Sequence, residues 1–391
     1  MESTIVPGAQ PAGSRPGGGS VVFDASPGPW GKLKCFYIFI EAPKSMVDDY
    51  PLPFSKPRWI FPESQLQALP ALFQKAGLPE AVSKVLLAPG NVKTDGDMVT
   101  IFPPVPDVEA MSQAAREVIY PELAKYQANE FYAEPVLMTT DTVEEWFRSS
   151  KLRPELIAKI SKLAWHRGEC LAFSDLQLMM GYAADDAEAR AIFKAFTRTR
   201  SLMVQMELDE HTNLQPLLDY WTIGSGFRRK DIEPIMQSII DTEGVDRLGI
   251  THILPALPRK LLYTYPGSEY ARLGMLPDCH WTSLNFFNYD PHQYLLDARL
   301  ATSSVLENFE PVPAPYRYGD VLFFVDSVQG DAFHSCVYLA DDMVFTKNGR
   351  NSFSPWVIMK LSDVKKIYIY NRNGRVQGYR HKKATAKFGD Q

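Results

Sequence analysis

The sequence of 391 residues contains few cysteines and no long apolar run. Its four cysteines are far apart and include no Cys-x-x-Cys spacing, which argues against a disulfide scaffold and a cysteine-type zinc site. No stretch of about 18 apolar residues is present, so the sequence predicts no membrane span. The net charge of −5 is small, which argues against nucleic-acid binding through bulk electrostatics.

Motifs for cofactor chemistry and export are also absent. The chain has no P-loop and no Gly-x-Gly-x-x-Gly opening a helix, and its histidines lack metal-ligand spacing such as His-x-x-x-His, so we expect no cofactor and no metal. Residues 1–29 are rich in Gly, Pro and Ser, lack the basic and apolar regions of a signal peptide, and predict a disordered tail. Two locations stay open: cytoplasmic, or exported or periplasmic if a leader was removed.

The first two thirds of the chain divide by their apolar periodicity. Aromatic and β-branched runs alternate with helical spacing over 30–140, which predicts a small α/β module. Almost every segment of 141–248, including DAEARAIFKAFTRTRSLMVQM, has a helical period and predicts a helical module. This module opens with a capping box formed by Thr142 and Glu145.

The region 249–375 has a different pattern. A short capped helix is followed by strand-like runs at Val321–Val325, His334–Leu339, Met343–Thr346 and Lys366–Tyr370. A helix followed by a meander of antiparallel strands is an α+β arrangement. The last segment, 376–391, is basic and predicts a flexible tail.

Cys279 is the first candidate site residue. It follows Asp278, which is a good N-cap, so Cys279 is expected at the first position of a helix. Trp281, Leu284 and Phe287 recur every third residue and would pack that helix down. The positive end of the helix dipole lowers the pKa of a thiol, and the thiolate is the reactive form, so the position predicts a nucleophile. The alternative is a buried and inert cysteine.

His334 is the second candidate, because it begins a predicted strand that can place an imidazole beside a helix N-terminus. A third polar group should orient this ring. Thr346 and Asn348 lie two residues apart on the next strand and therefore share a face. Asn348 is the better chemical candidate because its amide oxygen accepts a hydrogen bond, and Thr346 is the alternative. Lys347 only donates.

These features, in this order, resemble the NlpC-type cell-wall cysteine peptidases and amidases, which are papain-like enzymes with a Cys–His–polar triad. The resemblance covers about 265–372 and depends on three segments: Asp278–Cys279, Gly319–Phe324 and His334–Leu339. It implies a papain-like domain over 249–375, with the Cys helix packed on an antiparallel sheet. By the family's spacing the third member falls at Thr346, where histidine is common.

The sequence departs from that family at three positions. His280 and Trp281 follow the cysteine where the family has small residues, which puts the oxyanion site and the substrate groove in doubt. His280 is a candidate for the oxyanion site, although a packed histidine is the simpler interpretation. Cys336 stands where the family favours Gly, on the same strand face as His334.

The sequence thus predicts cysteine-dependent hydrolysis of an amide or peptide bond. The resemblance alone implies a bacterial cell-wall peptide as substrate. Two rivals stay open: a thiol acyltransferase on the same fold, and a catalytically inactive domain in a binding or scaffold protein. The oligomeric state and the roles of the two preceding modules are left open.

Overall fold

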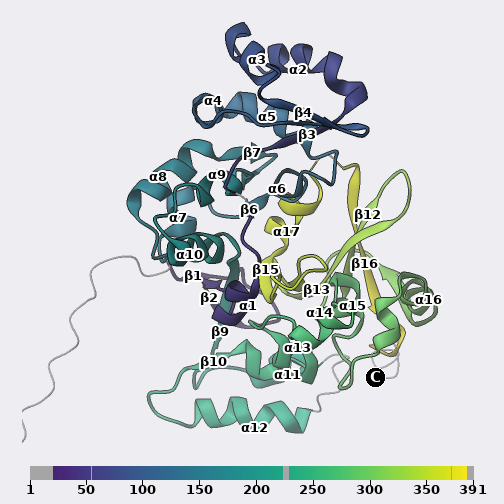
Figure 1. The fold of residues 1–391 in the computed structure, drawn as a ribbon. Helices are drawn as coiled ribbons and strands as arrows, with labels where there is room; N and C mark the ends of the chain where they lie inside the picture. Colours follow the sequence, from purple (N-terminus) through teal and green to yellow (C-terminus); the bar gives the residue numbers. More distant parts are fainter. Residues whose placement is uncertain (1–20, 54, 223–228, 371, 385–391) are drawn as a thin grey trace, which may run out of the picture.

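The computed structural model describes residues 21–53, 55–222, 229–370 and 372–384, and shows a mixed α+β fold with antiparallel sheets (Figure 1). In this described part no helix is long and apolar enough to cross a membrane. Residues 1–20 of the predicted tail lie outside the described residues. Of the remainder of that tail, Phe23 and Asp24 pair with the next strand, so this part is not a disordered segment.

The C-terminal sheet positions the candidate site. Its strand order is β11-β16-β12-β13-β14-β15, and every neighbouring pair is antiparallel. The strands are β11 (Phe309–Val312), β12 (Val321–Asp326), β13 (Ala332–Ala340), β14 (Met343–Lys347), β15 (Trp356–Lys360) and β16 (Gly374–His381). The strands predicted from Val321, His334 and Met343 onward are confirmed. They are buried almost without interruption because both faces of the sheet are covered.

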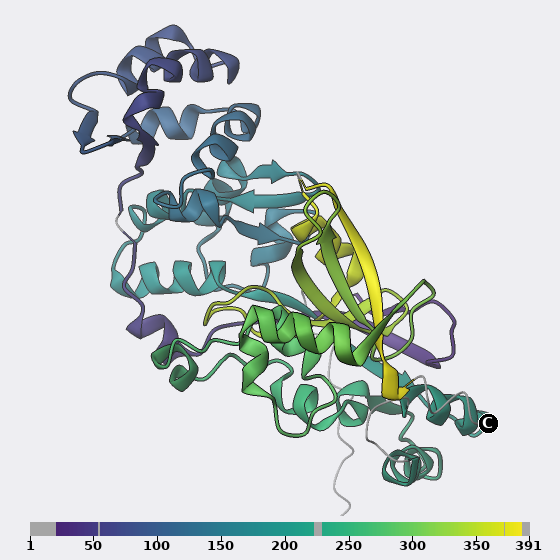
Figure 2. The same cartoon turned by 90° about the vertical axis from the view of Figure 1, so that its right-hand side faces the viewer.

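Different helices cover the two faces. On one face Phe323, Val337 and Phe345 share a core with α15 (Cys279–Leu284). On the other face Phe324, Cys336 and Val344 pack against α17 (Leu361–Tyr368). A further helix, α16 (Ala298–Asn308), follows η3 (Gln293–Leu296) and lies on the α15 side of the sheet, facing the viewer in Figure 2.

Two predictions for the C-terminal region are wrong. The strand predicted at Lys366–Tyr370 is largely part of α17, because Leu361 and Val364 are spaced to pack one helical face on the sheet. The predicted flexible tail from 376 onward begins inside β16, which pairs with both β11 and β12. The buried carboxylate of Asp320 accepts two hydrogen bonds of 2.7 Å from Arg380 and holds β16 in place.

A second antiparallel sheet has the order β1-β2-β9-β10 and corrects the helical module. Its strands are β1 (Phe23–Asp24), β2 (Lys32–Ile40), β9 (Thr199–Glu207) and β10 (Arg247–Gly249). The helix predicted through TRTRSLMVQM is wrong, because this segment forms β9 and pairs with β2 along its whole length. The side chain of Ser201 in β9 also bonds both backbone polar groups of Ile358 in β15. One apolar core therefore runs from β2 and β9 into the C-terminal sheet.

Residues 59–123 form the end of the molecule at the top of Figures 1 and 2. A small sheet with the order β3-β5-β4 packs there against helices around Trp59, Phe73 and Ile119. The elements are β3 (Trp59–Pro62), η1 (Glu63–Ala68), α2 (Leu69–Lys75), α3 (Glu80–Leu86), β4 (Val92–Asp95), β5 (Met98–Ile101), α4 (Val105–Ala110) and α5 (Gln113–Leu123).

The middle of the molecule combines helices with a sheet of order β6-β8-β7. The predicted capping box is confirmed, because Thr142 Oγ1 accepts a hydrogen bond from the N–H of Glu145. The elements are α6 (Glu130–Ala133), β6 (Val136–Met138), α7 (Val143–Phe147), α8 (Pro154–Leu163), β7 (Trp165–Arg167), β8 (Cys170–Phe173), α9 (Leu176–Met180) and α10 (Asp186–Phe196). The other helices are α1 (Lys44–Asp49), α11 (Leu214–Trp221), α12 (Arg229–Ile240), η2 (Ile250–Ile253), α13 (Ala256–Leu261) and α14 (Ser268–Arg272).

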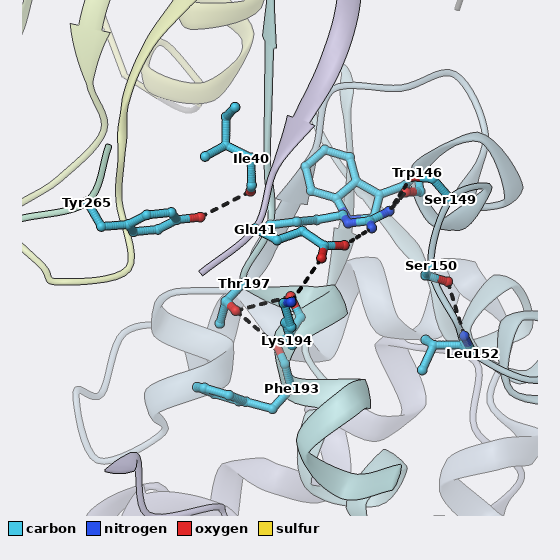
Figure 3. A network of polar contacts seen from close by, with 11 residues as sticks. Ile40, Glu41, Trp146, Ser149, Ser150, Leu152, Phe193, Lys194, Thr197 and Tyr265 are labelled. Atoms are coloured by element: carbon cyan, nitrogen blue, oxygen red, sulfur yellow. Dashed lines mark hydrogen bonds and ion pairs between the residues drawn. The ribbon is translucent and has the colours of Figure 1, made fainter. Parts of the chain in front are cut away.

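A polar network joins β2 to this middle region (Figure 3). Glu41, just after β2, forms ion pairs with Arg198 and, at 3.2 Å, with Lys194. Burial raises the pKa of Glu41, but these hydrogen bonds outweigh it and hold the pKa below its ordinary value. Next to it, the hydroxyl of Tyr265 donates to the carbonyl of Ile40 at 3.0 Å. The Tyr265 hydrogen bond ties the segment just before α14 (Ser268–Arg272) to β2.

Candidate functional site

Cys279 is the first residue of α15, as the sequence predicts. The Asp278 carboxylate accepts a hydrogen bond of 2.8 Å from the N–H of Trp281 and caps the helix. Trp281 and Leu284 are buried and fix the helix on the sheet. The local sequence therefore determines where this helix begins and which residue stands at its tip.

The environment of the Cys279 thiol raises its pKa, whereas the sequence predicts a lowered pKa. Its side chain is 8 % exposed. Burial and the neighbouring Asp278 carboxylate raise the pKa of the thiol to about 11, although the backbone N–H groups of Ser335, His280 and Cys279 itself act in the opposite sense. In this conformation the thiol is therefore protonated at neutral pH. The expected lowering by a helix terminus is outweighed because α15 is short and its tip is covered.

His334 lies on β13 and is fully buried. Its ring stacks on Tyr368 of α17, with 3.8 Å between the ring centroids. Its Nε2 atom is 3.2 Å from Thr346 Oγ1, whereas Nδ1 has no hydrogen-bond partner among the described residues. Burial holds the pKa of the imidazole well below its usual value, so the ring is neutral. In the tautomer whose Nε2–H donates to Thr346, Nδ1 carries the free lone pair.

The Cys279 thiol and the His334 ring approach β13 from opposite faces of the C-terminal sheet, because α15 packs on one face and the ring lies against Tyr368 of α17 on the other. The N–H of Ser335 acts on the thiol, which therefore lies against the peptide that joins His334 to Ser335. The thiol is also close enough to raise the pKa values of Tyr368 and Cys336, which flank His334 on the α17 side of the sheet. Within the described residues no hydrogen bond joins the thiol to the imidazole.

His280 holds the tip of α15 on β13. Its Nδ1 atom is 3.0 Å from Ser335 Oγ, which in turn donates to Ser283 Oγ at 3.1 Å. The ring also interacts with the backbone of Ala332 and stacks on Phe323. His280 is thus a packed histidine that positions Cys279 beside the strand of His334, and burial lowers its pKa.

Of the two candidates for the third group, Thr346 is the one that contacts His334. Asn348 lies just beyond β14, where its Nδ2 atom is 3.0 Å from the sulfur of Met359. Its Oδ1 atom has no partner among the described residues. Position along the strand explains this, because Thr346 lies within β14 beside the His334 ring, whereas Asn348 lies past the end of β14, next to Met359.

The site also contains residues that the sequence did not single out as functional. Tyr368 covers the His334 ring, and no local signal could have placed it there because it comes from a separate helix. Ser335 could have been found, since alternation along β13 must turn it toward α15. Arg350, in the loop after β14, donates to Asp278 Oδ2 at 2.8 Å and to the Leu296 carbonyl at 3.0 Å, and so closes the start of α15.

Lys347 is a buried cation beside this site. Its side chain donates to the carbonyls of Gly349 and Asn351 at 2.8 and 3.0 Å. Burial lowers the pKa of Lys347 to about 8, against the opposing effects of Asp278 and Cys279. The cation lies close enough to favour a thiolate at Cys279.

Replacing Lys347 by Met is expected to change how stability depends on pH. Between pH 8 and 10 the folded lysine loses its proton while the unfolded one keeps it, so the free energy of unfolding of the native protein rises with pH. The difference between native protein and variant should grow by about 2 kcal/mol over this range. Denaturant unfolding at both pH values measures it, with Lys93→Met, at an exposed lysine, as the control. A constant difference would contradict the buried cation.

Comparisons with known proteins do not assign the chain to a family. No family model matches it, and no curated protein or solved structure is significantly similar. Among the described residues, no group of three or more His, Cys, Asp and Glu side chains is arranged to hold a metal ion. The chemistry of the site must therefore be inferred from its own residues.

Proposed function

We propose that this protein hydrolyses an amide or peptide bond with Cys279 as nucleophile, His334 as general base and Thr346 as the group that orients the imidazole. The observation that carries the proposal is the state of His334. Its Nε2 atom contacts Thr346, and its buried Nδ1 atom is unpartnered among the described residues, on the strand that the thiol touches. A nucleophile, a base and an orienting group are the minimal set for thiol catalysis, and the proposal requires the Cys279 thiol to reach the imidazole across β13.

In the proposed reaction the Cys279 sulfur attacks the amide carbonyl carbon and its proton passes to His334 Nδ1. The C–N bond then breaks, the amine leaves with that proton, and a thioester remains on Cys279. Water, deprotonated by the same nitrogen, attacks the thioester, releasing the acid and restoring the thiol. The backbone N–H groups that act on the thiol, from Cys279 and Ser335, are suited to stabilise the developing oxyanion.

The papain-like fold and a cell-wall peptide substrate are finer parts of this proposal and come from the resemblance of 265–372 to NlpC-type enzymes. The Cys-bearing helix packed on an antiparallel sheet supports the first of them. A thiol acyltransferase would use the same groups and differ only in the acceptor of the acyl group.

One observation favours an inactive scaffold instead. The thiol is buried with a pKa of about 11, the imidazole is neutral, and Arg350 closes the loop over the start of the helix. For the proposed enzyme this arrangement would be a resting state, and catalysis would require the substrate to reach the thiol. The scaffold hypothesis predicts that the thiol stays inert.

The four cysteines provide an internal test of the two hypotheses. Cys35 and Cys170 are buried thiols whose pKa values burial also raises to about 11. We expect iodoacetamide at pH 7 to alkylate Cys279 at least about tenfold faster than either, because in the proposed mechanism Cys279 is the one of the three that His334 serves as a base. Peptide mass spectrometry gives the separate rates. Equal rates at all three cysteines would favour the scaffold.

A further inference from the structure

A pocket of about 530 Å³ lies next to α15, between α16 and the C-terminal sheet. We call it the α16 pocket. One wall is α16, the floor is formed by β12 and β16, and the end nearest the candidate site is formed by His280 and the turn that leads into β13. Its volume is within the range of pockets that bind small molecules. This side of the sheet faces the viewer in Figure 2.

The α16 pocket is lined by residues that are close in sequence to both Cys279 and His334. His280 lines it and is the chain neighbour of Cys279, while Ala332 lines it two residues before His334. Two other hollows beside α15, of about 450 and 740 Å³, touch the helix at Ser283 and Trp281 instead. Of these three hollows, the α16 pocket is the one lined by His280, the chain neighbour of the residue that carries the thiol.

The walls of the α16 pocket are mainly apolar. Val305 and Ala301 of α16 face Phe323 and Val325 of β12 across it. In α16, which the structure describes completely, Ala301 is the one buried residue, so this helix leaves apolar surface that a ligand could cover. Burying an apolar group between such walls is favourable, whereas burying an unpaired charge is costly.

We propose that the α16 pocket binds the apolar acyl group of the substrate, and so places the substrate among amides whose acyl part is apolar. This inference builds on the proposed function. The acyl carbonyl would lie at Cys279, and the remainder of the acyl group would extend past His280 between α16 and β12. Arg375 also lines the pocket and forms no ion pair with any residue that the structure describes. Its end of the pocket is therefore suited to a polar group at the far end of the acyl chain.

N-alkyl iodoacetamides with chains from methyl to octyl test this pocket on the whole protein, with the alkylation rate of Cys279 as the readout. The rate is expected to rise at least about tenfold from methyl to octyl, because the longer chain is buried before the thiol reacts. The rates of Cys35 and Cys170 should not follow chain length in this way.

Variants locate the effect. Ala301→Phe fills the pocket and should abolish the increase with chain length. Thr302→Phe, at an exposed position on the same rim, should reduce it and covers the case in which the buried substitution prevents folding. Ser304→Phe is the matched control, because Ser304 lines the hollow on the other side of α16 and the increase should persist.

The outcomes separate the pocket from the catalytic proposal. If labelling of Cys279 is fast and depends on His334 but does not change with chain length, the α16 pocket does not bind the acyl group. The proposed function would then remain intact. An increase that survives in both Ala301→Phe and Thr302→Phe would also overturn acyl binding in the α16 pocket. An increase that is lost in these two variants but is unchanged in His334→Gln would support the pocket and count against the proposed function.

Discussion

Replacing His334 by Gln is expected to slow the alkylation of Cys279 at pH 7 by about 100-fold. The thiol has a pKa of about 11 in its buried position, so without a base only a very small fraction is ionised. His334 is neutral and its Nδ1 atom has no partner among the described residues, whereas a glutamine side chain cannot act as a base at this pH. The measurement is the rate of Cys279 labelling by peptide mass spectrometry.

The pH dependence distinguishes loss of a base from a structural effect. Because the pKa of His334 lies well below 6.5, the imidazole can accept a proton down to pH 6, and labelling of the native protein should hardly change between pH 8 and 6. In the variant the rate should fall about tenfold per pH unit, since it follows the thiolate of a group with a pKa of about 11. The rate at Cys35 is the control. Parallel pH profiles for both proteins would remove His334 from the mechanism.

The second large effect concerns stability. Asp320→Asn is expected to lower the free energy of unfolding by about 3 kcal/mol, because it leaves the Arg380 guanidinium largely buried without its partner charge. The Asp320 carboxylate is 1 % exposed, accepts both arginine hydrogen bonds and also accepts from the N–H of Arg317 at 2.7 Å. An asparagine side chain has one accepting oxygen instead of two, so it cannot accept the hydrogen bonds from both Arg380 and the Arg317 N–H in the same way. Denaturant unfolding measures the change.

The exposed ion pair between Glu80 and Lys84 is the matched control. Its two side chains are 83 and 74 % exposed, so Glu80→Gln should cost less than about 0.5 kcal/mol. If Asp320→Asn is as mild as this control, Arg380 does not anchor β16, and the C-terminal segment is closer to the flexible tail that the sequence predicts.

Segments with strong local signals were predictable. The strands beginning at Val321 and Met343 are flanked by turn residues and consist mainly of apolar and β-branched residues. They could therefore be predicted without knowing which strands they pair with. Strand β9 was wrongly predicted as helix because the segment that precedes it has a helical period. Within β9 itself the period is two, and Leu202, Val204 and Met206 are the buried residues. Pairing with β2, more than 150 residues earlier, overrides the local preference.

The C-terminal segments were misread because their context is remote. Basic residues in GRVQGYRH suggest a solvated tail, but Asp320 neutralises Arg380 and the sheet binds the strand on both edges. Residues around Tyr368 are β-branched and aromatic, yet they continue a helix whose apolar side packs on the sheet. In both cases a distant surface decided the structure.

The sequence by itself determined the start of α15 and the presence of Cys279 at that position, because an N-cap acts within three residues. It also determined the strand that carries His334. Only the tertiary structure decided that the thiol is buried, that Thr346 rather than Asn348 contacts the imidazole, and that Tyr368 covers the ring. Capping and strand periodicity depend on neighbouring residues, whereas desolvation and side-chain partners depend on segments that are distant in the sequence and meet only in the folded chain.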